Sequence, residues 1–270
     1  MKPKSKVLII AGSDSSGGAG IQADIKTVTA LGSYAMTAVT AVTSQNTKGV
    51  KEIVSISSKS LKSQILMVLD DISPNAIKIG MLNNTSTIKC VHKILKKYKL
   101  KNIVLDPVMI AKGGARLVNI SSIKYLKKLL LPLCDLITPN IPEAEILTGY
   151  SIVNKGDMIK AAKKIINMGA KNVLLKGGHL KNKMIFDILV SKKEIRIFPK
   201  RKIKTKHTHG TGCTLSSALA TCLSQKKNMF KSCKISLDYV DKAILTAPGY
   251  GKGFGPLNHL VSFNLRKKNA

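Results

Sequence analysis

Tryptophan is absent from this 270-residue sequence, and aromatic residues make up only 4% of it. Single-stranded nucleic acids are bound largely by stacking of bases on aromatic rings, so few such platforms are available. Acidic residues are also scarce, because 14 Asp and Glu face 45 Lys and Arg and leave a formal net charge of +31. A charge of this size favours contacts with phosphates. The charge therefore suggests a nucleic-acid interpretation that the aromatic content opposes.

The positive charge is almost entirely lysine. Arginine, which reads bases and phosphates with two parallel hydrogen bonds, is limited to Arg116, Arg196, Arg201 and Arg266. The lysines are spread along the chain in short groups, mostly where a solvated helix face is expected. We interpret the charge as compositional, without specific nucleic-acid binding. A lysine-rich nucleic-acid-binding protein is kept as the alternative from another functional class.

The five cysteines indicate neither a disulfide framework nor a zinc ribbon, because their number is odd and no C-x-x-C pair occurs. The apolar run Val7–Ile10 near the start is too short for a secretory signal. No apolar stretch approaches the roughly twenty residues that span a bilayer. These absences predict a cytoplasmic protein with no membrane segment.

Short apolar runs alternate with amphipathic helical patterns, which indicates βαβ units and a mostly parallel sheet with helices on both faces. The segment 190–206 alternates enough to predict one or two antiparallel strands at an edge. No linker divides the chain, so we expect a single domain over residues 1–270. The predicted parallel strands are Val7–Ile10, Ala76–Ile79, Ile103–Leu105, Leu136–Ile137 and Val173–Leu175.

Each of these runs is followed at once by glycine, proline or polar residues. Ligands of open parallel sheets bind beyond the carboxyl ends of the strands, so the turns are expected to converge on one crevice. The turns are Gly12-Ser13-Asp14, Gly80-Met81, Asp106-Pro107, Thr138-Pro139-Asn140 and Lys176-Gly177-Gly178.

The glycine-rich stretch AGSDSSGGAGIQAD, residues 11–24, opens a predicted helix but matches neither of two familiar motifs. It begins its G-x-G-x-x-A pattern too far past the strand for a dinucleotide fold. It also lacks the Lys-Ser/Thr pair of a P-loop. The simple interpretation is a helix-capping turn, to which Asp14 and Asp24 add specific polar groups.

Several polar residues near the strand ends have both a structural and a functional interpretation. Most of TSQNTKG, residues 43–49, reads as a loop, although the Gln45 carboxamide can pair with a heterocycle through one donor and one acceptor. Asp106 can cap a helix, and Asn140 with Glu143 can form a capping box. In so basic a chain these carboxylates are also candidate Mg²⁺ ligands. Lys176 is a candidate phosphate contact or a solvated lysine.

The stretch His209-Gly210-Thr211-Gly212-Cys213 precedes leucines at helical spacing. Glycines at a helix mouth expose N–H groups that favour an anion, so this pattern predicts an oxyanion or phosphate cradle. The same field is expected to stabilise a thiolate and lower the pKa of Cys213. A small buried cysteine is the structural alternative, and it suits Cys222 better.

The motifs together resemble the hydroxymethylpyrimidine/phosphomethylpyrimidine kinases of thiamine biosynthesis, which belong to the ribokinase-like superfamily. The resemblance covers nearly the whole chain in order. It implies a three-layer α/β/α fold and phosphorylation by ATP, with Mg²⁺, of 4-amino-5-hydroxymethyl-2-methylpyrimidine and then of its monophosphate. The motifs are AGSDSSGGAGIQAD, AVTSQNT, KIGML, VLDPVMIAKGG, TPNIPEAE, LLKGGH and HTHGTGCTLSSA.

The resemblance also assigns roles. The implied substrate-binding residues are Gln45, Gly12, Asp24, Met81 and Val108. The implied nucleotide, phosphate and metal residues are Lys176, Asn140, Thr211, Asp106 and Glu143, with Asp106 and Glu143 as the Mg²⁺ ligands. The implied catalytic residues are Gly210, Thr211 and Gly212 as an anion hole and Cys213, where related sugar kinases have Asp, as the group that activates the substrate hydroxyl.

Two positions depart from the family pattern. Ser15 stands where proline is usual and His207 where asparagine is common. A pyridoxal kinase of the same superfamily is the nearest alternative, and the resemblance implies a homodimer.

Overall fold

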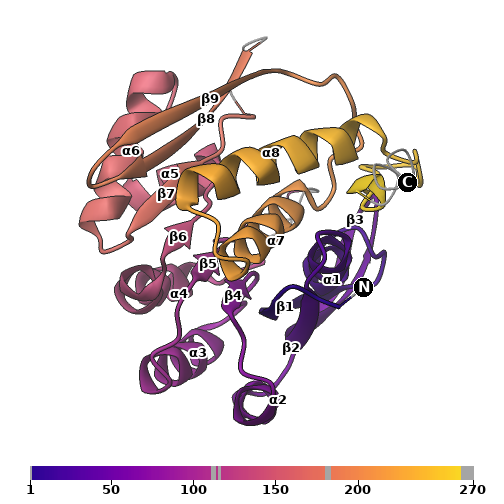
Figure 1. Cartoon of the computed structure of the whole chain (residues 1–270), viewed down its shortest axis with the longest axis vertical. Helices are drawn as coiled ribbons and strands as arrows, with labels where there is room; N and C mark the ends of the chain where they lie inside the picture. The colour runs from indigo at the N-terminus through magenta and orange to yellow at the C-terminus, as the bar shows by residue number, and fades with distance from the viewer. Residues whose placement is uncertain (1, 111–113, 115–116, 180–183, 263–270) are drawn as a thin grey trace.

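The computed structural model describes residues 2–110, 114, 117–179 and 184–262. Within these residues the strands form one nine-stranded sheet in the order β3-β2-β1-β4-β5-β6-β7-β8-β9 (Figure 1). The neighbouring pairs from β2 through β1, β4, β5 and β6 to β7 are parallel. The pairs β2–β3, β7–β8 and β8–β9 are antiparallel. The strands are β1 (Lys6–Asp14), β2 (Tyr34–Asn46), β3 (Gly49–Ser55), β4 (Ala76–Ile79), β5 (Ile103–Leu105), β6 (Leu136–Ile137), β7 (Asn172–Leu175), β8 (Met184–Ser191) and β9 (Ile195–Arg201).

Helices cover both faces of the sheet, which confirms the predicted three-layer arrangement. α1, α7 and α8 pack on one face and α2 to α6 on the other (Figure 1). α4 continues into a π-helical turn and a 3₁₀ turn. The helical segments are α1 (Gly20–Ala30), α2 (Ser58–Asp71), α3 (Thr85–Lys97), α4 (Ile120–Tyr125), η1 (Leu126–Leu130), η2 (Leu131–Leu133), α5 (Ile141–Thr148), α6 (Lys155–Asn167), α7 (Thr211–Ser224) and α8 (Met229–Leu245).

The central strand β1 divides the apolar core into two parts. Val7 and Ile9 face α1, α7 and α8, whereas Leu8 and Ile10 face the opposite layer. Successive side chains of a strand point to opposite faces, so an unbroken apolar run can feed both cores. Both cores are therefore built around the same buried strand.

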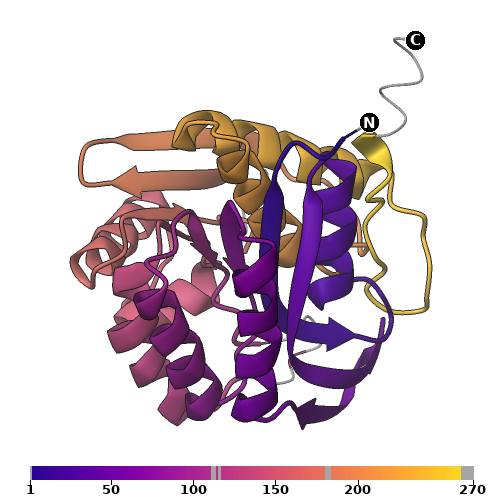
Figure 2. The same cartoon turned by 60° about the horizontal axis from the view of Figure 1, so that its bottom comes forward.

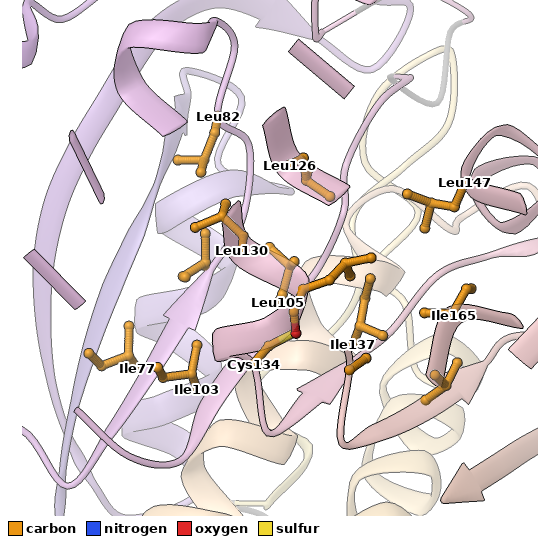
Figure 3. Packing of buried hydrophobic residues seen from close by; sticks show 14 of the residues in the cluster. Ile77, Leu82, Ile103, Leu105, Leu126, Leu130, Cys134, Ile137, Leu147 and Ile165 are labelled. Carbon is orange, nitrogen blue, oxygen red and sulfur yellow. The ribbon is translucent and has the colours of Figure 1, made fainter. Parts of the chain in front are cut away.

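The larger core lies between the sheet and helices α2 to α6. Leu105 and Ile137 lie on neighbouring strands, and Leu130 and Cys134 follow α4 (Figure 3). All four are almost completely buried. This packing fixes the ends of β5 and β6, from which site residues emerge.

Asparagine side chains begin many of the helices. Each accepts a hydrogen bond from the third residue of its helix, which satisfies one of the N–H groups left free at a helix start. The Asn caps with this bond are Asn84, Asn140, Asn154 and Asn228.

The five predicted parallel strands are confirmed, and so are antiparallel strands within 190–206. Two expectations are wrong. Gly12-Ser13-Asp14 is not a turn but the end of β1, and Thr43–Asn46 is not a loop but the end of β2, which pairs with β3. Glycine and polar residues, which usually mark turns, hid these strand ends. Residues 111–113 of the VLDPVMIAKGG motif lie outside the described residues.

The two sheet edges lie far apart. Figure 2 shows the orange β8–β9 hairpin and the indigo β1–β2 region on opposite sides of the molecule. In the part of the chain that the structure describes, no helix is long and apolar enough to cross a membrane.

The buried imidazole of His259 predicts a loss of stability in mild acid. It lies 3.0 Å from Oγ1 of Thr214, and burial lowers its pKa from 6.5 to about 4. Because the folded pKa is the lower one, this contribution is complete above pH 6.5 and is lost as the pH falls to 4. We expect the free energy of unfolding to drop by about 3 kcal/mol over this window. Urea denaturation at several pH values measures it, and His259→Gln is expected to flatten the drop.

Candidate active site

The carboxyl ends of the parallel strands surround a cavity of about 730 Å³. The predicted crevice is therefore present. The cavity is lined by most of the residues that the sequence singled out, from turns far apart in the chain. These lining residues are Gly12, Gln45, Met81, Asp106, Val108, Asn140, Glu143, Lys176, Gly210, Thr211, Gly212 and Cys213.

Asp24 is the predicted substrate residue that the structure does not bring to the cavity wall. It is fully buried, with Oδ2 2.7 Å from Nζ of Lys78 and Oδ1 accepting a hydrogen bond from Ser217. Burial would lower the pKa of Lys78, but the charge and hydrogen bond of Asp24, together with nearby Asp106, hold this pKa above its ordinary value. Burial raises the pKa of Asp24, and Lys78 opposes that rise. A charged pair thus lies inside the protein, with Lys78 reaching the cavity.

The sequence analysis did not single out Lys78. The signal that could have found it is a lone lysine inside the apolar strand Ala76–Ile79. A lysine at such a place is expected to have a buried carboxylate partner, because an unpaired ammonium in the interior is very costly.

Asp14 organises the first glycine-rich loop. Its carboxylate accepts hydrogen bonds from the backbone N–H groups of Ser16 and Ala19 and from the Ser16 hydroxyl. Burial alone would raise the pKa of Asp14, but the bonds from His209 and Ser16 lower it to about 2. The loop is therefore wrapped around a fixed negative charge.

His209 connects this loop to the start of α7. Its Nε2 lies 2.7 Å from Oδ2 of Asp14 and 3.3 Å from the Gln45 carboxamide. The backbone confirms the close approach, because a Cβ on Gly210 would collide with the carbonyl oxygen of Gly18. From the sequence, His209 is a candidate only for a zinc ligand with His207 and Cys213, for which no fourth ligand is apparent.

The start of α7 has the form expected of an anion cradle. Gly210 is the N-cap with φ of 78°, and the helix begins at Thr211, whose hydroxyl donates to the carbonyl oxygen of Thr208. The first N–H groups of a helix have no partners within it and carry its positive dipole end. Gly212 and Cys213 lie in this first turn, beside the cavity.

The expectation that this helix start lowers the pKa of Cys213 is wrong. Burial raises the pKa of the thiol to about 12, and the positive charge of Lys78 opposes the rise only in part. The side chain of Cys213 is only partly exposed at the cavity wall, and desolvation of a thiolate there outweighs the field of the helix. The structural interpretation of Cys222 as a small buried cysteine is confirmed.

Asp106, after β5, and Lys176, after β7, face each other across the end of β6. Nζ of Lys176 lies 3.2 Å from Oδ1 of Asp106, which also accepts a hydrogen bond from Thr138. Burial would lower the pKa of Lys176, but Asp106 and Glu143 hold it above its ordinary value. Asp106 is therefore an ion-pair partner and not a helix cap.

Asn140 and Glu143 form the predicted capping box at the start of α5. Burial raises the pKa of Glu143 to about 7, and the nearby Asp106 charge adds to the rise. Among the described residues no group of three or more His, Cys, Asp or Glu side chains could hold a metal. The oxygen pair of Asp106 and Glu143 fits Mg²⁺, which commonly takes one or two carboxylates and completes its shell with phosphates and water.

The far half of the cavity was missed by the sequence analysis. Lys200 of β9 contacts both Asp187, at 3.1 Å, and Asp241, at 2.9 Å. Leu237, Val240 and Ile244 of α8 line the same half. These α8 residues repeat at three and four positions, which is the helical spacing that could have revealed them.

Comparisons with known proteins agree with this geometry. Residues 14–258 match the phosphomethylpyrimidine kinase family. The chain belongs to this family. It is 44% identical over 257 residues to the hydroxymethylpyrimidine/phosphomethylpyrimidine kinase of Bacillus subtilis strain 168, with 95% of each chain covered.

A second relative of the kinase is a fusion. The chain is 45% identical over 260 residues to the thiamine biosynthesis bifunctional protein of Geobacter sulfurreducens. The match covers 96% of this chain and 53% of that protein, so the chain spans about half of the bifunctional protein's length.

Solved structures of kinases have the same fold. The phosphomethylpyrimidine kinase of Clostridium difficile 630 is 44% identical with a TM-score of 0.80, covering 89% of this chain and 99% of its own. The Bacillus subtilis pyridoxal kinase in its ADP complex is 35% identical with a TM-score of 0.89, covering 97% and 98%. The predicted ribokinase-like fold is confirmed.

Gly210→Ala is predicted to disrupt the site. The side chain would meet the Gly18 carbonyl and would also impose strain at positive φ. We expect a loss of stability above about 2 kcal/mol. Gly149→Ala is the matched control, because Gly149 has φ of 75° and no atom within 4 Å of an added Cβ, so only the strain of about 1 kcal/mol applies. Thermal denaturation compares the two, and equal losses would contradict the close approach.

Proposed function

We propose that this kinase transfers the γ-phosphoryl group of ATP to 4-amino-5-hydroxymethyl-2-methylpyrimidine and then phosphorylates the monophosphate. The observation that carries the proposal is one cavity that holds both Gln45 and the N-terminus of α7. The family match over residues 14–258 supports the same substrates. A ring-binding end and a phosphate-binding end then lie within reach of each other.

The ring-binding end combines apolar walls with one carboxamide. Met81 and Val108 line the cavity beside Gly12, where a Cβ would lie 2.8 Å from the Met81 methyl group. A glycine at this point leaves room for a flat ring close to the backbone. Gln45 then supplies the donor and acceptor that a heterocycle edge requires.

The phosphate-binding end is positively charged. The N–H groups at Gly212 and Cys213 face a transferring phosphoryl group, and Lys176 and Asn140 contact the nucleotide phosphates. Asp106 and Glu143 would hold Mg²⁺, which when bound neutralises charge on the phosphates. Phosphoryl transfer needs mainly positioning and electrostatic stabilisation, and a preorganised cradle provides both.

Cys213 is proposed to take the proton from the substrate hydroxyl. Only the thiolate can accept it, and a pKa of about 12 keeps the thiolate scarce near neutrality. The loose transition state requires little prior deprotonation of the attacking hydroxyl, so proton removal can follow the start of P–O bond formation. The Cys213 thiolate then increases the rate of phosphoryl transfer further, beyond the larger acceleration that the anion cradle provides.

The first test is turnover with the purified pyrimidine alcohol. We expect consumption of ATP to depend on this alcohol and to yield the monophosphate and then the diphosphate, resolved by chromatography. Pyridoxal is the comparison substrate, because pyridoxal kinases reach TM-scores of 0.87 to 0.89 with this chain. Faster turnover of pyridoxal would favour the second candidate function, and no turnover of either would contradict both.

The role of Cys213 predicts a pH dependence. Because its pKa lies far above neutrality, the thiolate fraction rises about tenfold per pH unit. Single-turnover rates should therefore increase with pH between 7 and 9 in the wild type. Cys213→Asp, with a base already ionised, should flatten the profile, and Cys213→Ala should lower kcat steeply while substrate still binds. Unchanged turnover in Cys213→Ala would remove the thiol from the mechanism.

The other expectations from the sequence stay predictions. They are the homodimer and the cytoplasmic location. The nucleic-acid interpretation is disfavoured, because the family match runs through residues 14–258.

A further inference from the structure

The hydrogen bonds around Asp14 determine where its neighbours carry protons. Its two carboxylate oxygens face backbone N–H groups of Ser16 and Ala19 and the hydroxyl of Ser16. A backbone N–H can only donate, so both oxygens act as acceptors. With a pKa of about 2, Asp14 carries no proton near neutrality. Any other polar group that contacts it must therefore donate.

His209 is that other group. Its Nε2 lies 2.7 Å from Oδ2 of Asp14, the oxygen that also accepts from Ala19. An imidazole nitrogen with a lone pair would repel a carboxylate at this distance, whereas an N–H forms a strong hydrogen bond. Nε2 of His209 therefore carries a proton. It has no lone pair to offer to a second neighbour.

The second neighbour is the carboxamide of Gln45, which the structure places with its Nε2 3.3 Å from Nε2 of His209 and its Oε1 toward Thr43. With the amide nitrogen at this end, a donor would lie against Nε2 of His209, which has no lone pair and whose single hydrogen points mainly to Asp14. With the oxygen at this end, Gln45 can accept the weaker branch of that shared hydrogen bond. Nitrogen and oxygen of a carboxamide are distinguished only by their hydrogen-bond partners, so the partners decide the assignment.

The opposite end of the carboxamide leads to the same assignment. It lies 3.1 Å from Oγ1 of Thr43, and that hydroxyl lies 2.9 Å from the carbonyl oxygen of Ser13. A carbonyl oxygen cannot donate, so the single hydroxyl hydrogen of Thr43 goes to Ser13. Oγ1 of Thr43 can then only accept from Gln45. The amide nitrogen belongs at this end.

We propose that His209 is a positioning residue: its Nε2–H, aimed by Asp14, fixes which end of the Gln45 carboxamide carries the oxygen. This also fixes the order in which the pocket presents its hydrogen-bond acceptor and donor to a ring. The carboxamide offers an acceptor on its His209 side and a donor on its Thr43 side. If the oxygen and nitrogen of the Gln45 carboxamide exchanged positions, two donors would meet at His209 and two acceptors at Thr43. Such contacts are costly in a partly buried network.

This direction selects a class of substrate edge. A ring that fits has a hydrogen-bond donor toward the His209 side and an adjacent acceptor toward the Thr43 side. An aminopyrimidine supplies this pair with its exocyclic amine and neighbouring ring nitrogen. The corresponding oxo-pyrimidine presents the reverse pair, a carbonyl beside a ring N–H. This step rests on the proposed function, because it takes Gln45 as the residue that reads the ring.

The proton position is tested without substrate. The full-length protein is labelled with ¹⁵N in its five histidines, and NMR correlates each ring nitrogen with its carbon-bound protons. His209→Gln identifies the signals of His209. We expect its Nε2 at the shift of a protonated nitrogen in the wild type at pH 7. A lone-pair shift at Nε2 would overturn the proposal, whether or not the kinase activity is as proposed.

The consequence for recognition is tested with His209→Phe, which keeps a ring but removes the donor. Thr43 alone then fixes the carboxamide, so the reversed orientation becomes more populated. We expect the KM for the aminopyrimidine alcohol to rise about tenfold, the size of one lost buried hydrogen bond, with the KM for ATP within about twofold of the wild type. His209→Gln, which restores an N–H, should recover most of the affinity.

The ratio of affinities for the amino substrate and its oxo analogue shows whether His209 positions Gln45 or only stabilises the fold. The wild type should bind the oxo analogue of the alcohol at least about tenfold more weakly than the amino substrate. His209→Phe should narrow this ratio, because Thr43 alone then holds the Gln45 carboxamide in one orientation. An unchanged ratio, or equal losses for ATP and the pyrimidine, would overturn the proposal.

His92→Phe is the matched control. Nδ1 of His92 bonds to the carbonyl oxygen of Leu129 in the α2 to α6 layer, and this residue does not line the cavity. The control should leave both KM values and the amino/oxo ratio unchanged. A change in the ratio equal to that of His209→Phe would contradict the assignment to His209.

Discussion

The contact between the first glycine-rich loop and the start of α7 is the constraint on which the site depends. Gly18 and Gly210 bring two backbones together where no side chain fits, and the bond from His209 to Asp14 closes the contact. Because Gln45 lies against His209, the same hydrogen bonds connect the proposed ring-binding end of the cavity to the proposed anion cradle. In the proposed reaction this contact would hold the ring and the phosphoryl group at a fixed separation, and such positioning is the main contribution that a protein makes to phosphoryl transfer.

The charges of this protein are distributed unevenly between surface and interior. Of its 14 acidic residues, five are buried, and four of these line the cavity. Each of the five has a specific donor, and lysines from β4, β7 and β9 neutralise three of them. The excess of lysine is thus a property of the solvated surface, whereas the buried carboxylates gather at the cavity and beneath it. The five buried acidic residues are Asp14, Asp24, Asp106, Glu143 and Asp187.

Cys213 shows how two electrostatic effects compete at one position. The helix start favours a thiolate, and the sequence pattern indicates this effect correctly. Burial disfavours the thiolate more strongly, so the pKa of Cys213 rises to about 12. Desolvation depends on how completely the surrounding elements cover a group, and that coverage comes from chain segments distant in sequence. The same coverage strengthens the cradle, because hydrogen bonds to a phosphoryl group gain strength where water is excluded.

The sequence by itself determined the layered α/β fold and the place of the site, since apolar runs and the turns after them are local signals. It indicated the Asn140–Glu143 capping box and the helix start at Gly210 for the same reason. Only the tertiary structure decided that Asp24 pairs with Lys78 beneath the cavity and that His209 orders Asp14 and Gln45. These partners are separated by 54 to 195 positions. Long-range pairing depends on how strands and loops pack in space, which no local pattern specifies.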